Sequence, residues 1–144
     1  ALKVIGLLVL SVLLASSMNM LFVLFTNTLS AFSTLSTIIG TLIGFLAGVY
    51  VPMGVLPTFA QNLIMLFPIS HSSLLLRDAF MAESINKVFA GVPIEHIEAY
   101  KINFGIMYEM NGSTLDTSTS LVVIISSIII FSIVSIIIFK KKNK

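Results

Sequence analysis

The sequence predicts an all-α integral membrane protein with three transmembrane helices and a broken re-entrant hairpin. Of its 144 residues, 57% are hydrophobic and 10% are charged, and the mean hydropathy is +1.08. A soluble domain carries about 25% charged residues, so eight basic and six acidic side chains are too few to cover a globule of this length. Two long runs without charge and a proline-interrupted stretch between them define the expected elements.

The first and last spans are expected over residues 4–25 and 118–139. Residues 4–25 hold no charged side chain, and as a helix they would be about 33 Å long, enough for a hydrocarbon core of about 30 Å. The last span begins in the polar run 116–120, a natural N-cap region. Its many β-branched residues would suggest a strand in water. A lone strand in lipid leaves its backbone unpaired, so a helix is expected.

A third span is expected over residues 33–51, followed by a re-entrant outer hairpin over residues 52–81. Prolines interrupt the chain after residue 51, and the apolar stretch 58–67 is only about half as long as a span requires. A second short helix, with Ser70 as its N-cap, is expected to complete the hairpin. Such a break is tolerated at membrane depth only where other helices or water satisfy its turns.

The charged residues predict the orientation. The stretch 82–113 is polar and is expected to form an extracytoplasmic loop with one helix near 94–104. The basic tail 140–144 contains four lysines, and the positive-inside rule places it in the cytoplasm of a multi-pass plasma-membrane protein. The N-terminus then falls outside. Because the chain starts without Met and shows no signal peptide, we expect it to be a fragment that lacks upstream spans.

Within the middle span, Gly40, Gly44 and Gly48 recur at four-residue spacing, which lets helix backbones approach closely in lipid. Packing against neighbouring spans of the same chain is favoured over a dimer seam, although three spans form a thin bundle and leave room for partners. The expected spans hold no ionisable residue, which argues against an ion-driven transporter.

The sequence offers no catalytic or metal site. His71, Ser72 and Ser73 are sequence neighbours that cannot face one another as a catalytic triad does, so an interfacial polar cap is favoured. The side chains of Glu95, His96 and Glu98 lack a metal-ligand spacing and are expected to be solvated. Residues 111–113 match a glycosylation acceptor and also a turn. There is no cysteine, which excludes disulfides and thiolate chemistry.

The run GVYVPMGVLP at 48–57, followed by Gln61, Pro68 and Arg77, resembles the end of the fifth span and the outer hairpin of type 2 ABC transporter permeases. In that family a Gly, a Pro, a Leu-Pro pair, a Pro about eleven positions on and an Arg follow in this order. The resemblance implies half of a six-helix permease: the C-terminal half, with spans four to six, of a subunit that pairs with a second permease copy as a homo- or heterodimer.

The same resemblance implies a function. The chain would belong to an ATP-driven bacterial exporter that moves a hydrophobic or amphipathic drug, peptide, lipid or glycan outward by alternating access. It would be no enzyme and hold no cofactor itself, because ATP would bind a separate cytoplasmic nucleotide-binding subunit. Its partners would be that ATPase, the second permease copy and membrane lipid, and no nucleic acid. The residues expected to form the outer hairpin and gate are Pro52, Gly54, Leu56, Pro57, Pro68, Arg77 and Asp78.

Two other function classes stay open. A small three-span immunity or scaffold protein would bind a toxin or another membrane complex and transport nothing. An intramembrane enzyme is disfavoured, because the expected spans offer neither a charged residue nor a pair of histidines for catalysis. More spans in the same reading frame would favour the exporter, whereas a start codon directly upstream would favour the immunity or scaffold protein.

Overall fold

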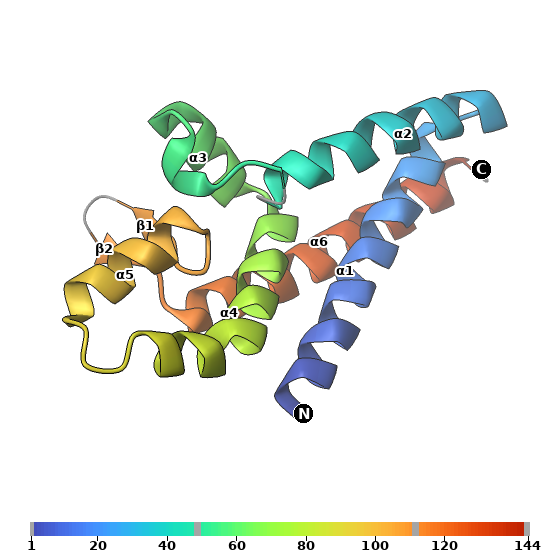
Figure 1. The fold of residues 1–144 in the computed structure, drawn as a ribbon. Helices are drawn as coiled ribbons and strands as arrows, with labels where there is room; N and C mark the ends of the chain where they lie inside the picture. The colour runs from blue at the N-terminus through green and yellow to red at the C-terminus, as the bar shows by residue number, and fades with distance from the viewer. Residues whose placement is uncertain (1, 48–49, 111–112, 143–144) are drawn as a thin grey trace.

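The computed structural model describes residues 2–47, 50–110 and 113–142, and this part of the chain is almost entirely helical (Figure 1). Its elements, in chain order, are α1 (Leu2–Phe25), α2 (Leu29–Leu46), the 3₁₀-helix η1 (Met53–Val55), α3 (Thr58–Leu66), α4 (Pro68–Val88), α5 (Ile94–Asn103), β1 (Glu109–Met110), β2 (Ser113–Thr114) and α6 (Thr117–Lys142). The two strands form a minimal antiparallel ladder in which Glu109 pairs with Thr114.

Helices α1 and α6 are the two described helices long and apolar enough to cross a membrane, with 24 and 26 residues. They lie side by side and run in the same direction (Figure 1). At their shared C-terminal end, Lys142 Nζ donates to the Leu24 carbonyl at 3.0 Å and to Asn27 Oδ1 at 2.9 Å. The chain between them must therefore return to the end at which α1 begins.

Helix α4 completes a three-helix bundle and runs antiparallel to α1. Ser72, near the start of α4, lies 2.6 Å from Ser11 of α1 between hydroxyl oxygens, and Asp78 farther along α4 lies 3.9 Å from Lys3. The buried apolar core between the three helices contains Leu7, Leu14, Met18, Leu74, Leu75 and Ile124. Most other large apolar side chains of α1 and α6 face outward, as lipid-facing side chains do.

Helices α3 and α4 meet at a sharp elbow, defined as the 92° bend at Phe67. Pro68 occupies the first turn of α4, where the missing proline N–H has no helical partner to lose. The expectation of a short second helix capped by Ser70 was wrong, because α4 has 21 residues and its N-cap is Phe67. Ser70 lies inside the first turn of α4.

Helix α2 stands apart from the bundle and differs from the expected span over 33–51. It begins at Leu29 because the Thr28 hydroxyl accepts from the Ala31 N–H at 3.1 Å and caps the helix four residues early. It ends at Leu46, with Ala47 as C-cap. Its stretch Leu29–Phe45 falls among the shorter apolar helices.

The polar stretch between α4 and α6 is more structured than a loop. Helix α4 continues to Val88, a turn with Gly91 at φ 85° follows, and α5 lies where a helix was expected near 94–104. The Asp116 carboxylate accepts from the Thr117 N–H at 2.8 Å and starts α6. Helix α6 extends through Lys142, so the described lysines of the expected tail belong to its last turn.

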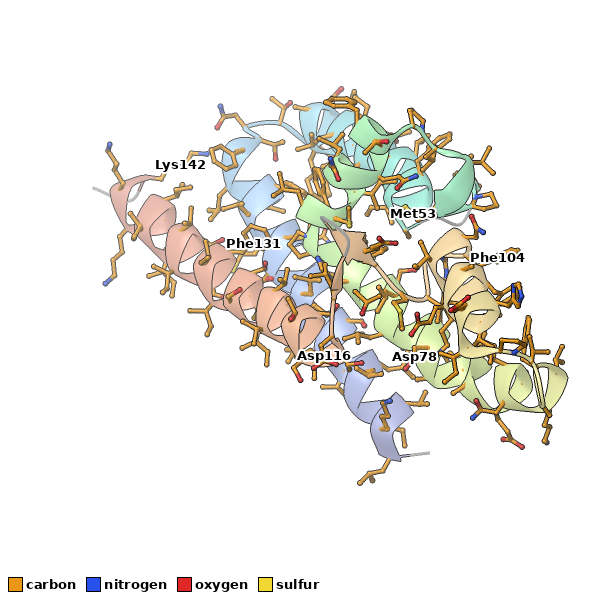
Figure 2. The ribbon with its side chains drawn as sticks, turned by 90° about the vertical axis from the view of Figure 1, so that its left-hand side faces the viewer. Met53, Asp78, Phe104, Asp116, Phe131 and Lys142 are labelled. Atoms are coloured by element: carbon orange, nitrogen blue, oxygen red, sulfur yellow. The ribbon has the colours of Figure 1, made fainter. Side chains whose placement is uncertain are left out.

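Charge is divided between the two ends of the bundle. All six acidic residues lie between α4 and the start of α6. In Figure 2, Asp78 and Asp116 lie near each other at one end, and Lys142 lies at the far end of α6. We call the end with Asp78 and Asp116 the acidic end, and the end with Lys140, Lys141 and Lys142 the lysine end.

Candidate functional site

The prolines expected to shape the outer hairpin each stand at the start of a helical element. Pro52 is the N-cap of η1, Pro57 is the N-cap of α3 and Pro68 lies in the first turn of α4. Proline suits these places because its fixed φ favours a break and its missing N–H costs no helical hydrogen bond. Leu56, the C-cap of η1, packs against the core.

Arg77 joins the C-terminal ends of two helices. Its Nη2 donates to the Ala47 carbonyl at 2.6 Å, and its Nη1 donates to the Phe104 carbonyl at 2.9 Å. Ala47 and Phe104 are the C-cap residues of α2 and α5. Carbonyl groups at a helix C-terminus lack helical partners and carry partial negative charge, so a guanidinium satisfies both needs. One turn earlier on α4, the Ser73 hydroxyl donates to the same Ala47 carbonyl at 3.0 Å.

Arg77 and Asp78 act separately, not as one anchoring pair. Consecutive residues of a helix point about 100° apart, and Asp78 faces Lys3 and Lys101 at 3.9 and 3.8 Å. Both ion pairs are long and partly exposed, so each contributes little to stability. Arg77 therefore binds two backbone carbonyls, those of Ala47 and Phe104, which the sequence did not reveal. Asp78 belongs to the charged surface of the acidic end.

His71 is buried, so the expectation of an interfacial polar cap was wrong for this residue. Its side chain is 2% exposed, with Nδ1 lying 3.0 Å from Ser120 Oγ and Nε2 lying 2.8 Å from the Met65 carbonyl. These bonds join α4 to the start of α6 and to α3. Ser72 bonds Ser11 instead, so no triad forms.

Ser70 and Tyr108 complete the polar interior of the elbow. The Ser70 hydroxyl lies 2.6 Å from both the Ile64 and the Phe67 carbonyls at the end of α3. The Tyr108 hydroxyl donates to the Ser70 carbonyl at 3.1 Å. Burial raises the pKa of Tyr108, although the Ser70 bond and the Arg77 charge oppose that shift, so the phenol stays protonated and donates.

Sequence reasoning missed Tyr108 and Ser120. Tyr108 stands in a polar stretch, and Ser120 is one of many serines in an apolar helix, so neither carries a local signal. Their roles depend on contacts 38 and 49 residues away in the chain.

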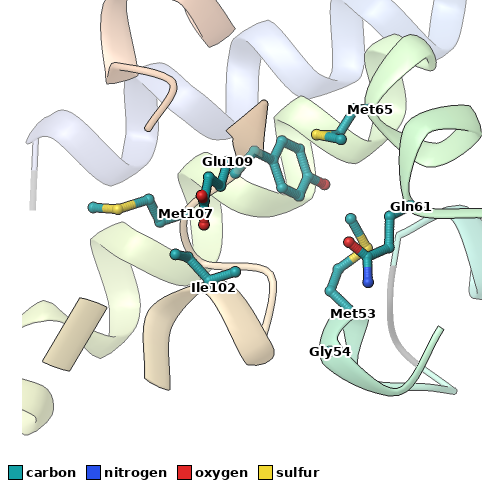
Figure 3. Close-up of a pocket in the computed structure, with 8 residues that line it drawn as sticks. Met53, Gly54, Gln61, Met65, Ile102, Met107 and Glu109 are labelled. Atoms are coloured by element: carbon teal, nitrogen blue, oxygen red, sulfur yellow. The ribbon is translucent and has the colours of Figure 1, made fainter. Parts of the chain in front are cut away.

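A cavity of about 160 Å³ lies beside the elbow, between η1, α3, α5 and β1 (Figure 3). The residues that line it are mostly apolar or uncharged, and they include Met53, Met65, Met107, Ile102, Gln61, Tyr108 and Glu109. Gly54 also borders it and closely approaches Asn103 of α5, whose side chain would overlap a Cβ at position 54. A larger residue at position 54 would therefore require the Asn103 amide to move.

The three glycines expected to pack helices behave differently. A Cβ added at Gly40 would meet nothing within 4 Å, whereas one added at Gly44 would overlap the ring of Tyr50 in the same chain. Gly48 lies outside the described residues. Packing of the described glycines against neighbouring spans of this chain is therefore not observed, and Gly40 presents an open backbone.

In the described residues, no three His, Asp or Glu side chains gather as metal ligands would. Glu95, His96 and Glu98 lie exposed on α5, and the start of the expected glycosylation acceptor, 111–112, lies outside the described residues.

No family model, curated protein or solved structure matches the chain.

Proposed function

We propose that the chain is a membrane-spanning part of an ATP-driven ABC exporter permease, and that the α3–α4 elbow is its outer gate. The proposal rests on the resemblance of residues 48–77 to type 2 permeases. The observation that carries it is the 92° elbow beside two parallel span-length helices. The second helix of the bent pair, α4, packs in the bundle, so a tilt of the elbow would be coupled to the spans α1 and α6.

The arrangement of contacts supports a gate. Arg77 ties the elbow helix α4 to the ends of α2 and α5, and Ser73 bonds the end of α2 as well. A tilt of α2 would therefore be transmitted to α4 through these two side chains, and to α5 through Arg77. Buried bonds of His71 hold the start of α4 to α6 and α3. The elbow would then move with its neighbours and not independently of them.

The charge distribution supports an orientation in the plasma membrane. The lysine end would be cytoplasmic under the positive-inside rule, and the acidic end, with α5 and the β-ladder, would face outward. A C-terminal tag should then resist external protease in right-side-out vesicles and be cleaved in inside-out vesicles. Cleavage from outside would contradict this orientation.

The exposed helix α2 supports the need for partners. Its apolar residues Leu29, Ile38, Leu42 and Phe45 are each at least 48% exposed, and Gly40 leaves room for a close backbone neighbour. In the proposed assembly, upstream spans and a second permease copy would cover this helix. ATP hydrolysis would take place on the separate cytoplasmic subunit, so this chain would contribute the path and the gate.

The test is purification of the native protein from source membranes in mild detergent, followed by mass spectrometry. We expect a co-purifying subunit with a Gly-rich phosphate-binding loop ending in Lys-Ser or Lys-Thr, and ATPase activity in the complex. Recovery of the chain alone, or with a toxin or an unrelated membrane complex, would contradict the exporter and favour the immunity or scaffold protein.

A further inference from the structure

We propose that the cavity between η1, α3, α5 and β1 binds small amphipathic cations, with Glu109 as the counter-charge. This binding goes beyond the proposed export, because it needs only this chain and holds whether or not the ligand is carried across the membrane. Three features support this binding. The wall of the cavity is apolar, the Glu109 carboxylate lies at its edge, and the neighbouring side chains Arg77 and Lys101 already contact other groups.

The wall of the cavity is soft and apolar. Met53, Met65 and Met107 line it together with Ile102. Methionine side chains are unbranched and polarisable, so they adapt to ligands of different shape. Met53 is only 6% exposed, which gives the cavity a buried floor that can cover an alkyl or aryl group.

The charge at the cavity comes from Glu109, the one charged residue among those described as lining it. Figure 3 shows its carboxylate turned toward Ile102, and the pairing of Glu109 with Thr114 holds the strand in place. Within the described part of the chain, Glu109 forms no ion pair. Its carboxylate can therefore accept hydrogen bonds from an ammonium group.

The nearby cations are engaged elsewhere. Arg77 donates to the Ala47 and Phe104 carbonyls, and Lys101 faces Asp78. An anionic ligand would meet the Glu109 carboxylate with no lining cation to offset it. Among the lining residues the formal charge is thus negative, which favours a cation.

Two further groups can contribute to cation binding. The Tyr108 hydroxyl is fixed on the Ser70 carbonyl, so its ring is a rigid part of the wall, and aromatic rings attract cations placed over their faces. The Gln61 amide donates one N–H to the Leu56 carbonyl at 2.8 Å, which leaves its oxygen as an acceptor and its second N–H as a donor. The Gln61 oxygen can therefore accept a hydrogen bond from an ammonium group.

Methyl NMR of the full chain in lipid nanodiscs tests the proposal, with ε-¹³C-methionine as the label. The probes are hexylammonium and, as a neutral counterpart of the same length, hexanol. We expect hexylammonium to shift the signals of Met53, Met65 and Met107 saturably, and to bind more tightly than hexanol. Met20 of α1 lies outside the cavity and is 48% exposed, so it reports partitioning into lipid, and the buried Met18 reports changes in the bundle core. Equal affinities for the two probes, or equal shifts at all methionines, would overturn the proposal.

The variant Glu109→Gln removes the charge and keeps the size of the side chain. We expect it to weaken hexylammonium binding about fivefold, as for a partly exposed ion pair, and to leave hexanol binding unchanged, which also shows that the cavity is still folded. Glu95→Gln, on the exposed surface of α5, is the matched control and should change neither. Ile102→Phe should fill the cavity and weaken both probes. Unchanged hexylammonium binding in Glu109→Gln or Ile102→Phe would contradict the site, whatever the purification experiment finds.

Discussion

The α1–α4–α6 bundle and helix α2 differ in how their polar side chains bond. The bundle has hydrogen bonds between helices, Ser11 with Ser72 and His71 with Ser120, although other serines of α1 and α6 donate to carbonyls of their own helix. In α2, the hydroxyls of Thr37 and Thr41 donate to carbonyls of their own helix four residues back and remain exposed. A Ser or Thr in an apolar helix therefore does not by itself indicate an interface.

The difference shows which of the two regions still has a surface that another helix can cover. In the bundle, buried polar groups of α1, α4 and α6 bond one another, and the Ser135 hydroxyl of α6 is the one described buried side-chain group without a partner. The threonines of α2 are satisfied without a neighbour, while its apolar side chains and Gly40 stay uncovered. Helix α2 thus keeps its described hydroxyls bonded without a neighbour and leaves an apolar surface on which another helix can pack closely.

The largest expected effect is on the buried histidine. We expect His71→Leu to lower the free energy of unfolding by about 3 kcal/mol, because it leaves the Ser120 hydroxyl and the Met65 carbonyl buried without partners. Unfolding by denaturant in detergent micelles would measure the loss. His96→Leu, at an exposed position of α5, is the control and should change little. Equal losses of unfolding free energy for the two variants would contradict the conclusion that the buried bonds of His71 stabilise the fold.

A smaller effect is expected at the link between the two regions. Arg77→Ala should cost about 1–2 kcal/mol, since it frees the Phe104 carbonyl of α5 and leaves the Ala47 carbonyl of α2 with only the Ser73 hydroxyl. Amide exchange should accelerate at the ends of both helices, more so at α5. In cells it should lower export without preventing membrane insertion. Arg77→Lys should recover only part of the effect, because an ammonium lacks the planar fork that reaches both carbonyls. Transport equal to wild type would remove Arg77 from the gate.

The difference between a hydroxyl that bonds another helix and one that bonds its own helix can be measured by deleting one hydroxyl of each kind. Ser72→Ala should cost about 0.6 kcal/mol, the average for a hydrogen bond between membrane helices. Thr37→Ala should cost close to nothing, because that hydroxyl bonds its own helix. A double-mutant cycle with Ser11→Ala should show coupling to Ser72. Absence of coupling would mean that the bond contributes nothing to packing.

The smallest effect on the chain's own stability is expected at Gly40. Gly40→Leu meets open space within the chain and replaces a poor helix former, so unfolding should be unchanged or slightly harder. Assembly should nevertheless be lost on native gels if a partner packs there. Gly44→Leu should also disturb packing, but it would displace Tyr50 as well, so Gly40 gives the cleaner result. Normal assembly of Gly40→Leu would place the partner seam elsewhere.

The sequence was most informative where composition alone decides structure. Helices were expected over 4–25 and 118–139, and α1 and α6 cover both ranges because a charge-free apolar run in lipid has no alternative to a helix. The stretch 33–51 was placed too late, because the Thr28 cap starts α2 at Leu29. Pro52, Pro57 and Pro68 were also informative, because proline restricts its own backbone and each of them stands at the start of a helical element.

The candidate site was harder to read because its bonds are non-local. Nothing in the run around His71 indicates that Ser120 is its partner, or that Arg77 reaches the ends of two helices. Those outcomes depend on which face of α4 meets which neighbour, and that is set by packing of the whole bundle. Tyr108 was missed for this reason as well.

The contact between α1 and α6 also bears on how the protein folds. Lys142 meets Leu24 across 118 positions of the chain, and the two helices share the most extensive interface between elements. Helix α1 must therefore stay in lipid without its main neighbour while everything between is synthesised. Contacts of such long range form slowly, so we expect the bundle to close late, with α1 open to quality-control proteases or to a membrane chaperone until α6 arrives.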